Sequence, residues 1–175
     1  MSELRKANTS SAYFITCTLV GWLNLFCHNR YCDIIIESLE YCRNHKQLEI
    51  YAYVIMPSHL HLILRHYDEN LNGILRDFKG HTAKEIYKQI LMENRQIRKN
   101  MLLNFIKNTA KSKLNQRYQI WQKTNYPIEL DYDRIFDQKL NYIHKNPLKA
   151  GIVNDESAYL YSSANPDSPL KVDLY

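Results

Sequence analysis

Two histidines separated by one leucine lie in the apolar stretch YVIMPSHLHLIL, residues 53–64. If this stretch is a strand, alternation places His59 and His61 on one face and the leucines on the other. Imidazole nitrogens bind Mn²⁺, Zn²⁺ and similar ions, but two of them need at least one further ligand. The pair therefore predicts an incomplete divalent metal site, with purely structural histidines as the alternative.

A tyrosine and an asparagine lie one helical turn apart in the stretch YIHKNP, residues 142–147. A four-residue spacing puts Tyr142 and Asn146 on the same helix face, which also carries Ile135 and Lys139, so the hydroxyl and the amide can converge. The amide oxygen of Asn146 could then be a third metal ligand. The alternative is that Tyr142 is a packing residue and Asn146 a polar helix end before a proline. His144 points elsewhere and is expected at the surface.

Positive charge is concentrated in residues 76–123, which carry 12 lysines and arginines against 3 aspartates and glutamates. The counts are 6 against 7 in residues 1–75 and 5 against 8 in residues 124–175. A basic block of this kind attracts nucleic acid through counterion release. The alternative is a solvated helix face with no such partner.

The composition is that of a globular protein, with 45% hydrophobic and 23% charged residues. No apolar run approaches the roughly 20 residues that a membrane-spanning helix needs, and the N-terminus lacks the pattern of an export signal. We expect one domain over residues 1–175, located in the cytoplasm without a membrane partner. The four cysteines form no Cys-x-x-Cys pair and are expected to be reduced.

The secondary structure that positions these residues follows from hydrophobic periodicity and turn residues. It consists of a strand at 11–20, a helix at 31–46, strands at 48–56 and 59–66 joined by Pro57-Ser58, helices from 71 to about 114 with a break near 93–100, a strand at 117–122 and a helix at 131–146. Asp131 or Asp133 should cap the last helix, which Pro147 and Gly151 should close.

This order predicts an α+β protein with the ferredoxin-like β-α-β-β-α-β pattern, an antiparallel sheet with helices on one face. A C-terminal helix carrying Tyr142 follows. In such a sheet the leucines would pack under the helices, and the histidines would open toward solvent and substrate. The fold alone hosts many functions, so the site must decide between them.

The sequence resembles the IS200-like, or REP-associated, tyrosine transposases, which are single-domain members of the HUH endonuclease superfamily. The resemblance rests on four stretches that occur in order over nearly the whole chain: YVIMPSHLHLIL, IWQ, LNYIHKNPLKAGIV and YLYSSA. Ser58 departs from the family, in which Asn often precedes the first histidine, and this difference concerns the local turn.

The resemblance implies that His59 and His61 bind Mg²⁺ or Mn²⁺, that Asn146 completes the metal site and that Tyr142 is the nucleophile. It also implies single-stranded DNA with a hairpin as substrate, cleaved and rejoined through a 5′-phosphotyrosine intermediate. A tyrosine hydroxyl is a weak nucleophile near neutral pH, so a nearby cation and an activated phosphate are needed. Whether the tyrosine acts in its own subunit or across a homodimer stays open.

The basic block would contact the DNA backbone, and exposed aromatic residues could stack on unpaired bases. Trp121 is expected in the core rather than on that surface. The predicted DNA contacts are Lys79, Lys84, Lys88, Arg95, Arg98, Lys99, Lys107, Lys111, Lys113 and Arg117.

Three other functions compete with a transposase. A domesticated DNA-binding protein of the same fold could bind without cutting, and it could lack the tyrosine or a metal ligand, which are all present here. A metal-dependent phosphoesterase acting on small molecules would need neither Tyr142 nor the basic block. A plasmid relaxase or replication initiator would share the chemistry, but usually in a longer chain.

Overall fold

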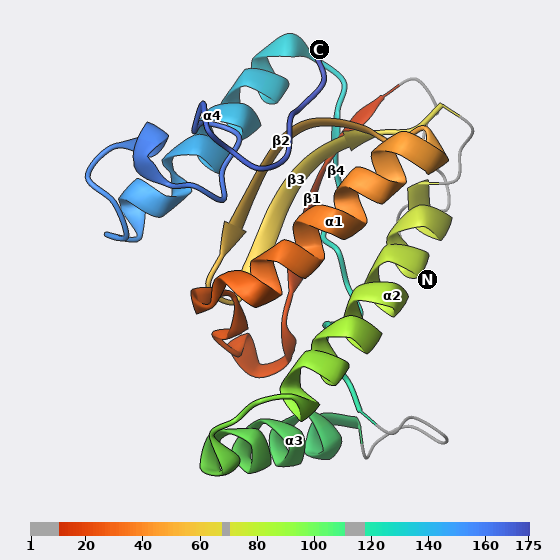
Figure 1. The fold of residues 1–175 in the computed structure, drawn as a ribbon. Coiled ribbons are helices and arrows are strands. Elements are labelled where there is room, and N and C mark those ends of the chain that lie inside the picture. The colour runs from red at the N-terminus through yellow and green to blue at the C-terminus, as the bar shows by residue number, and fades with distance from the viewer. Residues whose placement is uncertain (1–10, 68–70, 111–117) are drawn as a thin grey trace.

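The computed structural model describes residues 11–67, 71–110 and 118–175 (Figure 1). Its strands are β1 (Ala12–Thr18), β2 (Glu49–Met56), β3 (His59–Arg65) and β4 (Ile128–Leu130). Its α-helices are α1 (Asn29–Lys46), α2 (Leu71–Leu91), α3 (Gln96–Ala110) and α4 (Asp133–Lys149). Short 3₁₀ turns lie at η2 (Val20–Trp22), η3 (Leu25–Cys27) and η4 (Glu156–Ala158).

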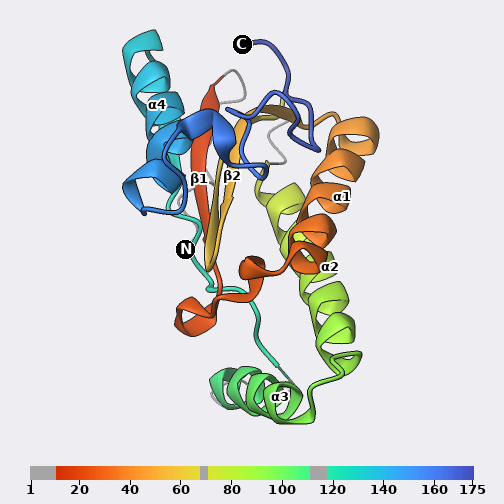
Figure 2. The same ribbon diagram turned by 60° about the vertical axis from the view of Figure 1, so that its left-hand side comes forward.

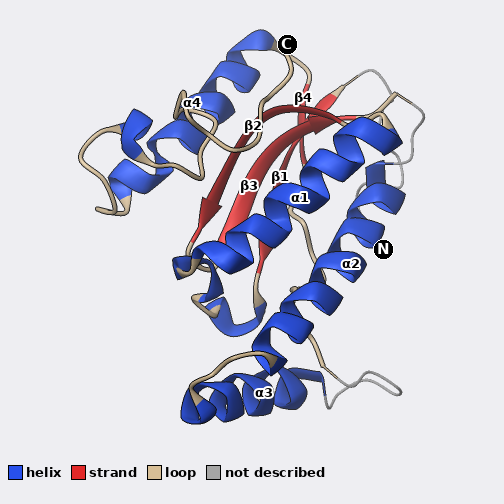
Figure 3. Ribbon diagram, viewed as in Figure 1, coloured by secondary structure: helices blue, strands red, loops and turns tan. Residues whose placement is uncertain are grey.

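The four strands form one antiparallel sheet in the order β2-β3-β1-β4 (Figure 3). β2 and β3 form the predicted hairpin, and β1 lies between β3 and β4, which is the ferredoxin-like arrangement. The predicted fold class is therefore confirmed. A register shift between Ile50 and Ala52 marks a bulge in β2, so the alternation of β2 changes phase there.

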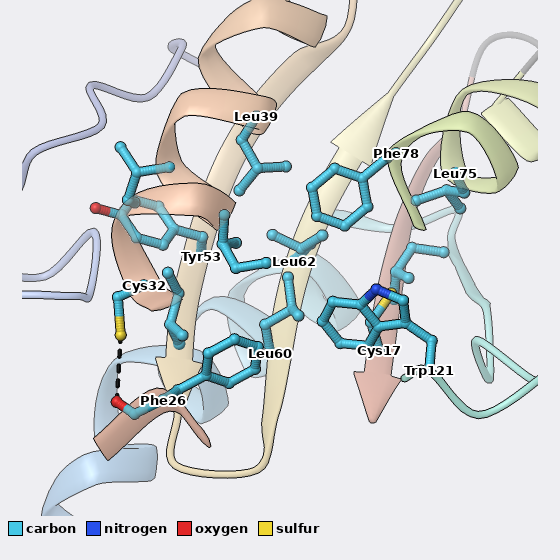
Figure 4. Close-up of a cluster of buried hydrophobic side chains, with 14 of the residues drawn as sticks. Cys17, Phe26, Cys32, Leu39, Tyr53, Leu60, Leu62, Leu75, Phe78 and Trp121 are labelled. Atoms are coloured by element: carbon cyan, nitrogen blue, oxygen red, sulfur yellow. Dashed lines mark hydrogen bonds between the residues drawn. The ribbon is translucent and has the colours of Figure 1, made fainter. Parts of the chain in front are cut away.

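One face of the sheet packs against α1 and α2 through a large hydrophobic cluster (Figure 4). The leucines of β3 are fully buried in it, each contributing about 1.5–3 kcal/mol relative to an exposed side chain. Trp121 is also buried there, as expected, and its Nε1 donates a 3.0 Å hydrogen bond to Thr82 Oγ1. The Cys32 thiol donates to the Phe26 carbonyl at 3.2 Å.

The opposite face is covered by α4, which contradicts the expectation that this face opens to solvent (Figure 2). Phe136 and Ile143 of α4 pack in a second cluster with Ala52 and Val54 of β2. The small side chain of Ala52 fits a close approach of the helix to the sheet. The sheet is thus sandwiched between α1 and α2 on one side and α4 on the other.

The predicted strand at 117–122 is wrong in position. Trp121 makes only an isolated bridge to Leu19, and the fourth strand begins later, at Ile128. The aromatic and β-branched residues that suggested a strand at 117–122 are instead explained by burial of Ile120 and Trp121 in the core.

The bounds of α4 also differ from the prediction. Tyr132 occupies the N-cap without a side-chain hydrogen bond, so neither Asp131 nor Asp133 caps the helix. Pro147 lies inside the last turn, where its missing N–H costs a single hydrogen bond, and the helix continues to Lys149. Gly151 then adopts a left-handed φ of 68° at the helix end, as the sequence predicted.

The segment after α4 runs along the outer edge of β2 and connects it to the helix. Tyr159 donates from its hydroxyl to the Ile55 carbonyl at 2.8 Å, and Ser162 bridges to Val54. The YLYSSA motif therefore has a structural role, because its residues attach this segment to β2. Within the described residues, none of the helices combines the length and the apolarity that crossing a membrane requires.

Candidate active site

The two histidines of β3 lie side by side on the face that α4 covers. Their ring centroids are 4.8 Å apart, and the leucines between and after them point into the opposite core, so the predicted alternation is confirmed. Thr16 pairs with His61 across the β1–β3 ladder, and its Oγ1 lies 2.9 Å from His61 Nδ1. This hydrogen bond fixes the orientation of the His61 ring.

The Nε2 atom of His61 is buried and has no hydrogen-bond partner among the residues that the structure describes. His61 is only 5% exposed, so the expectation that this histidine opens to solvent is wrong; Phe14 stacks on it at 5.2 Å between ring centroids. A buried nitrogen without a partner is uncommon in folded proteins and suggests a missing ligand. With Nδ1 engaged by Thr16, Nε2 is the atom free to bind a metal ion.

Burial also determines the protonation of the pair. It lowers the pKa of His61 to about 3, and repulsion from Lys139, and from His59 when that ring is protonated, acts in the same direction. Burial likewise lowers the pKa of His59. Both imidazoles are therefore neutral at physiological pH, which is the form that ligates metals.

The histidine pair fits a divalent ion only with further ligands. Across the described residues, no group of three or more His, Cys, Asp and Glu side chains is placed to hold a metal. An amide oxygen, water or a substrate phosphate oxygen would have to complete the coordination, which suits Mg²⁺ or Mn²⁺ better than a closed structural zinc site.

Tyr142 of α4 lies directly over His61 of this pair. Its ring centroid is 5.2 Å from that of His61, with 69° between the planes, and it also meets the edge of Phe14 at 5.8 Å. The side chain remains 38% exposed, so a substrate can reach it. The tyrosine and the histidine pair that lie together here belong to the same chain.

Two lysines supply positive charge at this tyrosine. Lys139 Nζ lies 5.8 Å from the centroid of the Tyr142 ring and 4.9 Å from that of Phe14. Lys149 Nζ lies 5.9 Å from the same tyrosine ring, on its other side along the helix. Lys139 was predicted on the face of Tyr142, whereas Lys149, Phe14 and Thr16 were missed. The alternation of β1 could have indicated Phe14 and Thr16 once its pairing with β3 was known.

Asn146 is half-buried one turn after Tyr142. No hydrogen bond in the described parts of the chain joins its amide to either histidine, so its role as a metal ligand stays a prediction. His144, expected at the surface, is half-buried, and its Nε2 lies 3.0 Å from Ser163 Oγ. This contact joins α4 to the segment beside β2 and helps hold Tyr142 over the sheet.

The turn before His59 is compatible with serine. Ser58 Oγ lies 3.3 Å from His59 Nδ1, and the Ser58 carbonyl accepts a 2.9 Å hydrogen bond from Leu19 N. Trp22 of η2 packs its ring against the edge of the His59 ring at 5.7 Å.

The predicted DNA contacts that the structure describes lie in different surroundings. Lys79 is half-buried and donates to the carbonyl of Gln122 and to Asn125 Oδ1 at 2.6 and 2.7 Å, so its ammonium group is already engaged within the protein. Lys84 and Lys88 are exposed on α2, which covers the sheet face opposite the histidines, and Lys88 also pairs with Glu85.

The remaining predicted contacts differ in their surroundings. Arg98 is partly buried beside Glu93 at 3.7 Å, and Lys99 is half-buried. Arg95 is exposed just before α3, and Lys107 is exposed on α3. Lys111, Lys113 and Arg117 lie outside the described residues. Arg95 and Lys107 are thus the exposed predicted contacts at α3, which lies toward the end of the sheet where β3 begins (Figure 1).

A ferredoxin-like sheet with a His-x-His strand beneath a helix tyrosine is the arrangement that the resemblance to IS200-like tyrosine transposases implies. Comparison with known proteins agrees with the family resemblance and with the fold. The chain is 27% identical over 134 residues to a Haemophilus influenzae protein described as a REP-associated tyrosine transposase, covering 75% of this chain and 66% of the relative. The match thus spans just under two thirds of the relative's length.

A solved structure of a REP-associated tyrosine transposase bound to a REP hairpin has the same fold. It superposes with a TM-score of 0.63 at 20% identity, over 93% of this chain and 82% of that one. No family model matches the sequence. The predicted resemblance to REP-associated tyrosine transposases is confirmed by the relative and by the fold.

Proposed function

We propose that this protein cuts and rejoins hairpin-bearing single-stranded DNA, with Tyr142 as the nucleophile. The observation that carries the proposal is the position of the Tyr142 ring over His61, whose buried Nε2 has no partner in the described part of the chain. The REP hairpin in the related solved structure supports a hairpin as the substrate feature.

In the proposed reaction, the Tyr142 oxygen attacks the scissile phosphorus and loses its proton, while the bond from phosphorus to the 3′-oxygen breaks. The products are a 5′-phosphotyrosine and a strand end that takes up a proton as a 3′-hydroxyl. Another 3′-hydroxyl can reverse the attack and rejoin strands, because the covalent link conserves the phosphodiester. No nucleotide cofactor is then needed.

His59, His61 and Asn146 would hold a Mg²⁺ or Mn²⁺ ion, which supplies Lewis-acid stabilisation of charge on the phosphate oxygens. The chain's own residues do the rest. Thr16 keeps the His61 ring oriented, and Lys139 and Lys149 place positive charge beside the ring that becomes the attacking phenolate.

The test is to incubate the protein with labelled hairpin-bearing single strands and Mn²⁺ and to look for a covalent adduct on a denaturing gel. The adduct should require the metal and the tyrosine. Tight hairpin binding with no adduct over a broad set of hairpins would instead identify a non-cutting DNA-binding protein of the same fold.

A further inference from the structure

The most exposed aromatic residue beside the histidine pair is Trp22. Its side chain is 61% exposed, although its ring meets that of His59 at 5.7 Å between centroids and 77° between planes. The chain has two tryptophans, and the other, Trp121, is buried in the core. The large indole is thus exposed to solvent while it contacts a predicted metal ligand, which suggests that it binds something there.

The backbone that presents this indole is strained. Trp22 has a φ of 56°, in the left-handed region that a side chain with a Cβ atom disfavours. Gly21 before it has a φ of 57°, and a Cβ atom at Gly21 would lie 2.3 Å from Phe105 of α3. Two successive left-handed residues make a tight turn, and glycine is favoured at the first of them by its positive φ and by the close approach of the Phe105 ring.

Backbone hydrogen bonds hold this turn in place. Val20 donates to the Ile120 carbonyl at 2.8 Å, and Trp22 donates to the Leu19 carbonyl at 3.2 Å. Strained residues held by their surroundings occur preferentially at ligand-binding positions. The turn thus connects α3, which carries exposed Lys107, to the edge of His59.

We propose that Trp22 is a stacking platform for an unpaired nucleobase of the single-stranded DNA that flanks the hairpin, and that it positions the scissile phosphate over the histidine pair. The proposal rests on the proposed function and deepens it. An exposed indole accepts any base on its π-face, and its contact with His59 places that base next to the reacting phosphate. A backbone tracking past α3 would be attracted by the charge there.

The two tryptophans allow base stacking on Trp22 to be measured by fluorescence. Trp22 is accessible and Trp121 is buried, so a base that stacks on Trp22 should quench the exposed part of the tryptophan fluorescence. The probes are a DNA hairpin with short single-stranded tails on both ends and the same hairpin with blunt ends, titrated in EDTA so that no cleavage is expected. Stacking predicts quenching by the tailed hairpin alone.

Three variants test whether the indole causes the effect. Trp22→Gly removes the ring and relieves the left-handed strain, so its unfolding midpoint should be unchanged or higher. Its affinity for the tailed hairpin should fall by about 5- to 150-fold, the range found when a stacking aromatic is removed. Trp22→Phe keeps an aromatic ring, so its affinity for the tailed hairpin should fall less. Tyr41→Ala, which removes an exposed ring from α1 on the opposite face, should bind normally.

The outcomes separate this proposal from the proposed function. Equal affinity of Trp22→Gly and the native chain for the tailed hairpin, with no quenching, would overturn the stacking proposal even if the native chain forms a covalent adduct. Quenching by the tailed hairpin that Trp22→Gly abolishes would support stacking. That result would stand even if the native chain formed no adduct, which would overturn cleavage alone.

Discussion

The ring of Tyr142 lies 5.2 Å from the ring of His61 in the same chain, between centroids. This relationship joins a helix that begins at Asp133 to a strand that begins at His59, and it depends on α4 covering the face of the sheet that carries the histidines. The tyrosine and its predicted metal site are thus assembled within one polypeptide.

The first prediction is that Tyr142 acts on DNA bound at its own histidines. A mixture of Tyr142→Phe and His61→Ala, each expected to be inactive alone, should remain inactive. If α4 were exchanged between subunits of a dimer, the mixture would contain native sites and would form adduct. Denaturing gels of the mixture against the native chain measure the difference directly.

The second prediction concerns the orientation of His61. Thr16→Val removes the hydroxyl that lies 2.9 Å from His61 Nδ1, so the ring loses its orienting contact. The affinity for Mn²⁺, measured by titration calorimetry, should fall by about 10- to 100-fold.

Thr18→Val is the matched control for this variant, because Thr18 belongs to β1 like Thr16, is buried and lies opposite His59. It should reduce the Mn²⁺ affinity much less. A similar loss in both variants would indicate a general packing defect and would contradict a specific role of Thr16.

The third prediction concerns the charge of α3. Lys107→Ala should weaken binding of single-stranded DNA and flatten its dependence on salt, by about 0.7 in the slope of log K against log salt if one phosphate contact is lost. Lys46→Ala, an exposed lysine at the end of α1, should leave the slope unchanged. Unchanged binding in Lys107→Ala would exclude a phosphate contact at this residue.

The fourth prediction concerns stability against pH. Asp173 accepts hydrogen bonds from Arg43 Nε and from Ile50 N, at 3.0 and 2.9 Å, which hold the C-terminal segment against β2. The bond from Arg43 is the main cause that lowers the pKa of Asp173 below its ordinary value. Its stabilisation is therefore present above pH about 4 and is lost as the pH falls through the lowered value.

Asp173→Asn should lower the free energy of unfolding by about 1.5–3 kcal/mol near neutral pH, the range for hydrogen bonds to a charged group. The difference from the native chain should shrink as the pH falls toward 2. Urea unfolding at several pH values measures it, with exposed Asp167→Asn as the control. A difference that stays constant with pH would show that the carboxylate charge does not contribute.

The sequence predicted those parts of the site that depend on a local period. Alternation in β3 placed His59 and His61 on one face, and the helical spacing placed Lys139 on the face of Tyr142; the structure has both. These placements follow from backbone geometry that does not depend on the rest of the chain.

The burial of His61 could not be predicted in this way. It depends on which face of the sheet α4 covers. The apolar side of α4, which contains Phe136 and Ile143, could pack on either face. Similarly, Trp121 lies in a stretch rich in strand-forming residues, but its burial beside Thr82 takes it into the core without forming a strand. The predictions of an exposed His61 and of a strand at 117–122 were therefore both wrong for the same reason, because tertiary packing overrides a local pattern.

The measurement that tests the account most directly is adduct formation with labelled hairpin-bearing single strands in Mn²⁺, comparing the native chain with Tyr142→Phe. The account predicts a covalent adduct that survives denaturation in the native chain, disappears with EDTA and is absent from Tyr142→Phe. An adduct that persists in Tyr142→Phe would contradict the assignment of Tyr142 as the nucleophile.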